Sequence, residues 1–126
     1  MKTVLCFGNP YLKGDSLASE LAHELQVPGY QFIRCQFADD IFNYKDLEEI
    51  YILDVVEGID NVQLITDIDK IKRHKSLTMH DLDLGFFLKL MKAIGKLEKI
   101  KRIGLPTKTN LQTLKNQVEE LLSKDL

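Results

Sequence analysis

Three polar residues stand where a chain of alternating strands and helices commonly carries out chemistry. Asp15 follows the turn Gly8-Asn9-Pro10, Asp54 interrupts the apolar run 50–56 near its carboxyl end, and His80 precedes a long amphipathic segment. Two carboxylates and an imidazole with open positions suit a borderline divalent transition metal, because imidazole favours zinc, nickel and similar ions. Asp15, Asp54 and His80 are therefore candidate metal ligands and candidate catalytic residues.

Each of these residues also has a purely structural alternative. Asp15 precedes a helical pattern, where an aspartate commonly caps the free backbone N–H groups. Asp54 could bond the turn after its strand, although a carboxylate inside an apolar central strand is costly unless it is paired or ligated. His80 could be a polar residue in the first turn of a helix, since Thr78 and Asp81 resemble a capping box with Asp in place of Glu or Gln. Spacing alone leaves the metal site and these structural roles open.

The sequence offers no common protease pattern. Cys6 and Cys35 each lie in an apolar run typical of a strand, so we expect buried free thiols rather than a disulfide. Neither cysteine has a sequence neighbour that would lower its pKa, which argues against a thiolate nucleophile. No Ser-His-Asp or Cys-His set can be assembled, and there is no His-Glu-x-x-His zinc motif.

The periodicity of the apolar residues divides the chain into strands and helices. Apolar or alternating runs predict strands at 4–7, 30–37, 50–56, 62–66 and 100–105. Apolar residues at helical spacing predict helices from 16 to the stop at Pro28-Gly29, over 82–94 with Gly95 ending it, and over 110–123. Residues 39–45 are expected to form a loop or one helical turn, and the charged segment 67–76 to run over the surface.

This order predicts the fold class α/β, as a single three-layer domain over residues 1–126. Alternating elements give a mostly parallel sheet, here of about five strands, with helices on both faces. Ligands of such sheets bind beyond the carboxyl ends of the strands. The expected core comprises Val4, Leu5, Phe7, Ile52, Leu53 and Ile103 in the sheet, with Leu21, Leu88, Met91 and Leu121 packed on it.

Composition narrows the class of protein. The net charge is −2, and nothing suggests the clustered basic surface of a nucleic-acid-binding protein. The basic residues Lys96, Lys99, Lys101 and Arg102 are expected to form a solvated helix end and strand edge. The apolar run 4–7 is too short for a signal peptide core or a membrane span, so we expect a cytoplasmic protein without a membrane partner.

Three segments carry a resemblance to a known family. Gly8-Asn9 is followed after a short stretch by Asp15, Asp54 stands in the context Ile-Leu-Asp-Val-Val-Glu-Gly, and His80 in Thr-Met-His-Asp-Leu-Asp-Leu. In this order and spacing they resemble the motifs of the hydrogenase maturation endopeptidases, over most of the chain. Two positions depart from the family pattern: Gly14-Asp15-Ser16 replaces the frequent acidic-acidic-Gly, and Ala18 stands where a glycine is common.

The resemblance implies an endopeptidase that removes the C-terminal extension of a hydrogenase large-subunit precursor. The metal would be nickel carried by that substrate, bound by Asp15, Asp54 and His80, and another divalent metal could take its place in a crystal. A precursor without nickel would bind poorly, so cutting would wait for metal loading. The alternative is a maturation chaperone of the same fold that binds a metal or the precursor without cutting it, and a third reading is an α/β domain whose polar residues only cap helices.

Overall fold

The computed structural model describes residues 2–7, 17–35, 38–44, 46–56, 58–65, 92–93, 95, 100–107 and 109–124. Five strands form one sheet in the order β2-β1-β3-β5-β4. The elements along the chain are β1 (Lys2–Phe7), α1 (Leu17–Glu24), β2 (Tyr30–Cys35), a 3-10 helix (Ala38–Tyr44), β3 (Ile50–Val55), β4 (Gln63–Ile65), β5 (Ile100–Leu105) and α3 (Leu111–Ser123).

All strands of the sheet are parallel except β4, the outermost strand on one side. β1 pairs in parallel with both β2 and β3, β3 pairs in parallel with β5, and the short β4 runs antiparallel to β5. The central strand β3 is buried along its whole length, as expected for a parallel strand that is covered on both faces. The carboxyl ends of β1, β2, β3 and β5 therefore lie at the same edge of the sheet.

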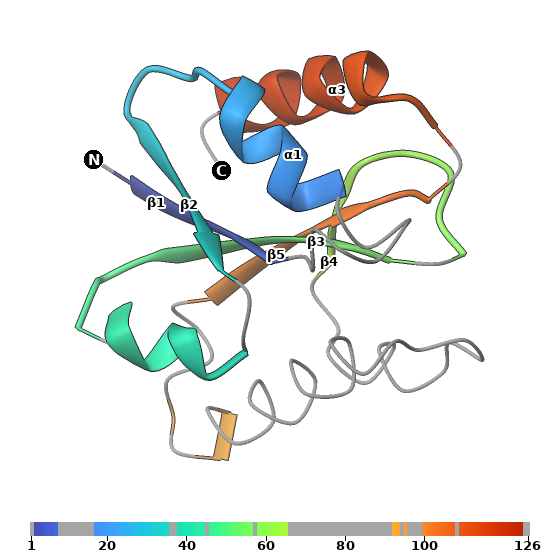
Figure 1. The fold of residues 1–126 in the computed structure, drawn as a ribbon. Coiled ribbons are helices and arrows are strands. Elements are labelled where there is room, and N and C mark those ends of the chain that lie inside the picture. The colour runs from blue at the N-terminus through green and yellow to red at the C-terminus, as the bar shows by residue number, and fades with distance from the viewer. Residues whose placement is uncertain are drawn as a thin grey trace.

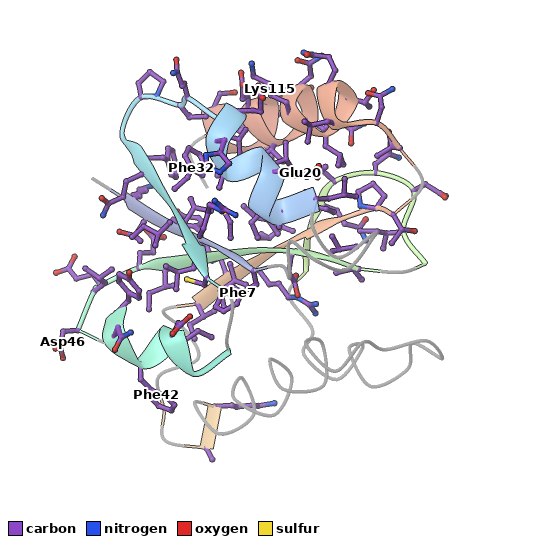
Figure 2. The ribbon with its side chains drawn as sticks, viewed as in Figure 1. Phe7, Glu20, Phe32, Phe42, Asp46 and Lys115 are labelled. Atoms are coloured by element: carbon purple, nitrogen blue, oxygen red, sulfur yellow. The ribbon has the colours of Figure 1, made fainter. Side chains whose placement is uncertain are left out.

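Helical elements cover the two faces of the sheet differently. In Figure 1, α1 and α3 lie side by side over one face, and the 3-10 helix lies on the other. We call these the two-helix face and the 3-10 face. Figure 2 shows Phe32 on the side of α1 and Phe7 on the side of the 3-10 helix. This separation confirms the predicted sheet with helices on both faces.

The core is divided between these two faces because side chains alternate along each strand. On the two-helix face, the cluster includes Val4, Tyr51, Leu53, Ile103, Leu21, Leu114 and Val118. On the 3-10 face, it comprises Leu5, Phe7, Cys35, Ile41, Ile50 and Ile52. All six core residues predicted in the sheet are buried, as is Leu21. Leu121 is only partly buried and packs on the rim of the first cluster, whereas its neighbour Leu122 is buried.

The ends of the helices follow from local chemistry. The side chain of Asn110 accepts a hydrogen bond of 2.8 Å from the backbone N–H of Thr113, which caps α3 at its N-terminus. After α1, Gly29 has a φ of 87° and leads into β2. Lys92 and Ala93 are helical, and Gly95 follows with a φ of 78°, in agreement with the predicted end of a helix there.

Several expectations lie outside the described residues, among them Leu88, Met91 and the segment 67–76. The segment 39–45, expected as a loop or one helical turn, lies mainly in the 3-10 helix, which extends over seven residues. The predicted strand 30–37 is confirmed as β2 from Tyr30 to Cys35, and residues 36 and 37 lie outside the described residues. Within the described ranges, no helix is long and apolar enough to cross a membrane.

Replacing Leu53 by alanine is expected to lower the free energy of unfolding by about 2–5 kcal/mol. Leu53 is fully buried in the middle of β3, so the substitution removes apolar contacts and leaves a cavity between the sheet and the two helices. Urea denaturation followed by circular dichroism would measure the change. Leu121→Ala, at a partly buried position, is the matched control and should cost less. A loss well under 1 kcal/mol for Leu53→Ala would contradict this account of the core.

Candidate active site

Asp54 lies at the end of the parallel sheet where ligands commonly bind. It is the penultimate residue of β3, at the carboxyl end of the central strand. Alternation along β3 places its side chain on the 3-10 face, with Ile50 and Ile52. The residue is completely buried, in a strand that is otherwise apolar or aromatic. A buried carboxylate in such surroundings requires a partner.

The partner of Asp54 is Arg102 of β5. Nε of Arg102 donates to Oδ1 of Asp54 at 2.8 Å, and Nη2 donates to Oδ2 at 2.7 Å. The side chain of Arg102 is 6% exposed and that of Asp54 is not exposed at all. This is the two-point geometry in which a guanidinium and a carboxylate fit each other best. Pairing of the buried Asp54 carboxylate is therefore confirmed, since each of its oxygens accepts a hydrogen bond from Arg102.

Strand register explains how these two residues meet. Asp54 lies opposite Gly104 in the ladder between β3 and β5, and Arg102 lies opposite Ile52. Arg102 is thus one diagonal step from Asp54 on the same face. Gly104 contributes no side chain between them. The guanidinium can therefore extend along the strand direction to the carboxylate.

The expectation that Arg102 belongs to a solvated basic stretch was wrong. Arg102 is 5% exposed, whereas the side chain of the adjacent Lys101 is about one-third exposed and binds Glu49 at 2.8 Å. Lys96 and Lys99 lie outside the described residues. The reason is alternation: inside a strand, neighbouring residues point to opposite faces, so a run of basic residues cannot share one environment. Two signals in the sequence pointed to Arg102, namely the strand pattern 100–105 and a buried carboxylate that needed a cation.

Asp15 and His80 lie outside the described residues, so the predicted triad of Asp15, Asp54 and His80 stays a prediction. Among the residues that the structure does describe, no group of three or more His, Cys, Asp or Glu side chains is placed to hold a metal ion. Of the three predicted ligands, Asp54 is the one that belongs to the described residues. Ala18, at the position where the family often has glycine, is fully buried in the core of the two-helix face.

A second polar cluster lies at the opposite edge of the sheet. Glu49 bonds Lys101 at 2.8 Å and approaches Lys2 at 3.9 Å. The ammonium of Lys2 lies over the rings of Tyr30 and Tyr51, at 5.7 and 5.8 Å from their centroids. The hydrogen bond from Lys101 is the main cause that holds the pKa of Glu49 below its ordinary value of 4.5. These contacts tie the amino ends of four strands together, away from Asp54.

The two cysteines are buried free thiols, as predicted. Cys6 belongs to the core of the two-helix face and Cys35 to that of the 3-10 face, so the sheet separates them. Burial raises the pKa of both thiols to about 12, with a further contribution from Cys35 at Cys6 and from Asp40 at Cys35. Neither thiol has the lowered pKa that a nucleophilic cysteine needs.

We expect both thiols of the folded protein to react slowly with a disulfide reagent between pH 7 and 9. An unfolded thiol ionises near pH 9, whereas the folded thiols, with pKa values of about 12, stay protonated. At each pH in this range the thiols should therefore react far faster in urea than in buffer, because a much larger fraction of them is ionised in the unfolded chain. The same pKa values set how stability depends on pH. The neutral thiols contribute fully to the free energy of unfolding below pH 9, and this contribution is lost as the pH rises towards 12. Fast labelling in buffer would contradict the buried placement.

No family model and no curated protein matches this chain. Solved structures do match it over almost its whole length. It is similar to the NiFe hydrogenase maturation protease HybD from Thermococcus kodakarensis, with a TM-score of 0.66, 20% identity and coverage of 98% of both chains. For the hydrogenase maturating endopeptidase HybD from Escherichia coli, the TM-score is 0.71 at 16% identity, with coverage of 98% of this chain and 91% of that one.

The solution structure of an endopeptidase from Escherichia coli gives a TM-score of 0.72 at 13% identity, covering 97% of this chain and 90% of that one. At these identities the likeness establishes a shared fold. One fold can host several functions, so a shared fold alone does not determine the function of this chain.

Proposed function

We propose that this chain is a hydrogenase maturation endopeptidase. It removes the C-terminal extension of a hydrogenase large-subunit precursor, in the cytoplasm, and recognises the precursor through the nickel bound there. The observation that carries the proposal is the likeness of the fold, over nearly the full length, to solved structures named as hydrogenase maturation proteases. The sequence motifs around Asp15, Asp54 and His80 resemble those of the same family, and this resemblance does not depend on the fold.

The position of Asp54 supports the proposal at the level of the site. One of the three proposed ligands lies at the carboxyl end of the central strand, where open parallel sheets bind their ligands. Asp15 and His80 would complete the set. Carboxylate and imidazole donors suit nickel.

The proposed chemistry assigns the metal to the substrate. Nickel in the precursor would act as a Lewis acid that polarises the scissile carbonyl or activates a water molecule. Asp15, Asp54 and His80 would orient the precursor by meeting that nickel, so that the bond to be cut stands beside it. A precursor without nickel lacks this attachment and would be cut slowly or not at all.

A specific observation favours a second candidate, a non-catalytic chaperone of the same fold that binds the precursor. Asp54 is completely buried, and both of its oxygens already bind Arg102. A carboxylate in that state does not reach an external metal without some local change. On this second reading, Asp54 and Arg102 hold the strands together and the precursor binds elsewhere.

The deciding experiment incubates the purified protein with a hydrogenase large-subunit precursor, once loaded with nickel and once without it. Mass spectrometry would detect the released C-terminal fragment. We expect the fragment from the nickel-loaded precursor only. Binding of the loaded precursor without any fragment would favour the chaperone, and cleavage of both forms alike would refute recognition through nickel.

A further inference from the structure

The pair of Asp54 and Arg102 has a chemical consequence for metal binding. An ionised carboxylate offers about four lone-pair positions, two on each oxygen. Arg102 occupies one on each oxygen, at 2.8 and 2.7 Å, and brings a full positive charge next to them. A cation that approached Asp54 would meet a neutralised carboxylate and a guanidinium that repels it. Burial strengthens both effects, because the local dielectric constant is low.

Stability alone gives little reason for such a pair. Removing two charges from water costs as much as their attraction returns, so a well-packed apolar pair is often equally stable or more so. The pair lies at the carboxyl end of the sheet, where ligands bind, rather than at its amino end. At that other edge the ion pair of Lys101 and Glu49 keeps about one-third of each side chain exposed. The buried pair therefore calls for an explanation in terms of binding.

We propose that Arg102 is a positioning residue that keeps the site from taking up free divalent metal ions. It neutralises the Asp54 carboxylate and fixes its direction until a precursor supplies its own bound nickel. This inference rests on the proposed function, because it takes Asp54 to be a residue that meets the substrate's metal. A free ion can displace the guanidinium only with the energy of its own binding to the site. Nickel in a precursor is accompanied by the contacts of the whole protein, whose binding energy can offset that displacement.

The proposal predicts that a substitution next to a metal ligand raises the affinity for free metal ions, which is the opposite of the usual effect. Neighbours of metal ligands commonly raise affinity, and their loss lowers it by about 10–100-fold. Arg102 is a cation, so its loss should raise the affinity of the protein for a free ion instead. Lysine at this position keeps the charge but not the two-point geometry. Charge and geometry can therefore be separated by comparing Arg102→Gln with Arg102→Lys.

The experiment titrates the purified protein with nickel chloride in a calorimeter, without precursor. We expect weak binding by the unmodified protein and binding at least about tenfold tighter by Arg102→Gln. Arg102→Lys should stay close to the unmodified protein. Lys101→Gln is the matched control, because it removes a cation from the adjacent position on the opposite face, and it should change nothing. Adding Asp54→Asn to Arg102→Gln should abolish the gain.

Three results would overturn the inference. Nickel binding by Arg102→Gln that is no tighter than that of the unmodified protein is the first, and a gain that survives Asp54→Asn is the second. If Arg102→Gln does not fold in buffer, nickel should restore its circular dichroism spectrum, because binding to the folded state stabilises it. Failure of nickel to do so is the third. The nickel titration contains no precursor, so its outcome is separate from that of the cleavage experiment. If the unmodified protein does not cleave the precursor, the proposed activity is refuted. The role of Arg102 in excluding free metal ions is tested by the titration alone.

Discussion

Replacing Arg102 by leucine is expected to lower the free energy of unfolding by about 3–5 kcal/mol, because it leaves the Asp54 carboxylate buried without its cation. This is a large part of the 5–15 kcal/mol that a domain of this kind typically has. Urea denaturation at neutral pH would measure it. The penalty arises from desolvation of a charge, since the leucine itself is well accommodated by an apolar core.

The double variant Asp54→Leu/Arg102→Leu tests that reason. With both charges removed, its stability should return to within about 1–2 kcal/mol of the unmodified protein or exceed it. Lys101→Leu provides a second comparison, because its ion pair with Glu49 is partly exposed and should contribute little. If the double variant is as unstable as Arg102→Leu, loss of packing rather than an unpaired charge is the cause, and the account given for this pair is wrong.

Replacing His80 by alanine is expected to abolish cleavage of the nickel-loaded precursor. His80 is the proposed imidazole ligand, and without it this chain would contact the precursor's nickel through carboxylates alone, so that the scissile bond is no longer positioned. Thermal unfolding should be almost unchanged, because His80 is predicted to lie at the rim of the sheet and outside the core. Cleavage is measured by mass spectrometry of the released fragment.

His23→Ala is the matched control for His80→Ala. His23 is an exposed histidine on α1 that contacts Arg34 at 2.7 Å, and it lies on an element assigned to packing. Its removal should leave cleavage intact. Full cleavage by His80→Ala would show that the proposed triad is not the catalytic set, whereas loss of cleavage in both variants would point to a general effect on the fold.

Much of the architecture could be predicted because it follows from patterns local to the sequence. Continuous apolar runs marked β1 and β3, and their parallel pairing required no knowledge beyond the alternation of strands with helices. The burial of Leu53 and Ile103 followed from the same patterns. Boundaries were less certain, since the 3-10 helix is longer than the single turn predicted for residues 39–45.

The sequence by itself determined that Asp54 would stand at the carboxyl end of a buried strand and would need a partner, because a carboxylate among apolar residues cannot remain uncompensated. Only the tertiary structure decided that this partner is Arg102, 48 residues further along the chain. Strand order and register place the two residues one diagonal step apart, and neither property is encoded in a local pattern. Long-range pairing depends on how whole strands assemble, so a residue that looked like one more solvated cation is in fact the counterion at the centre of the candidate site.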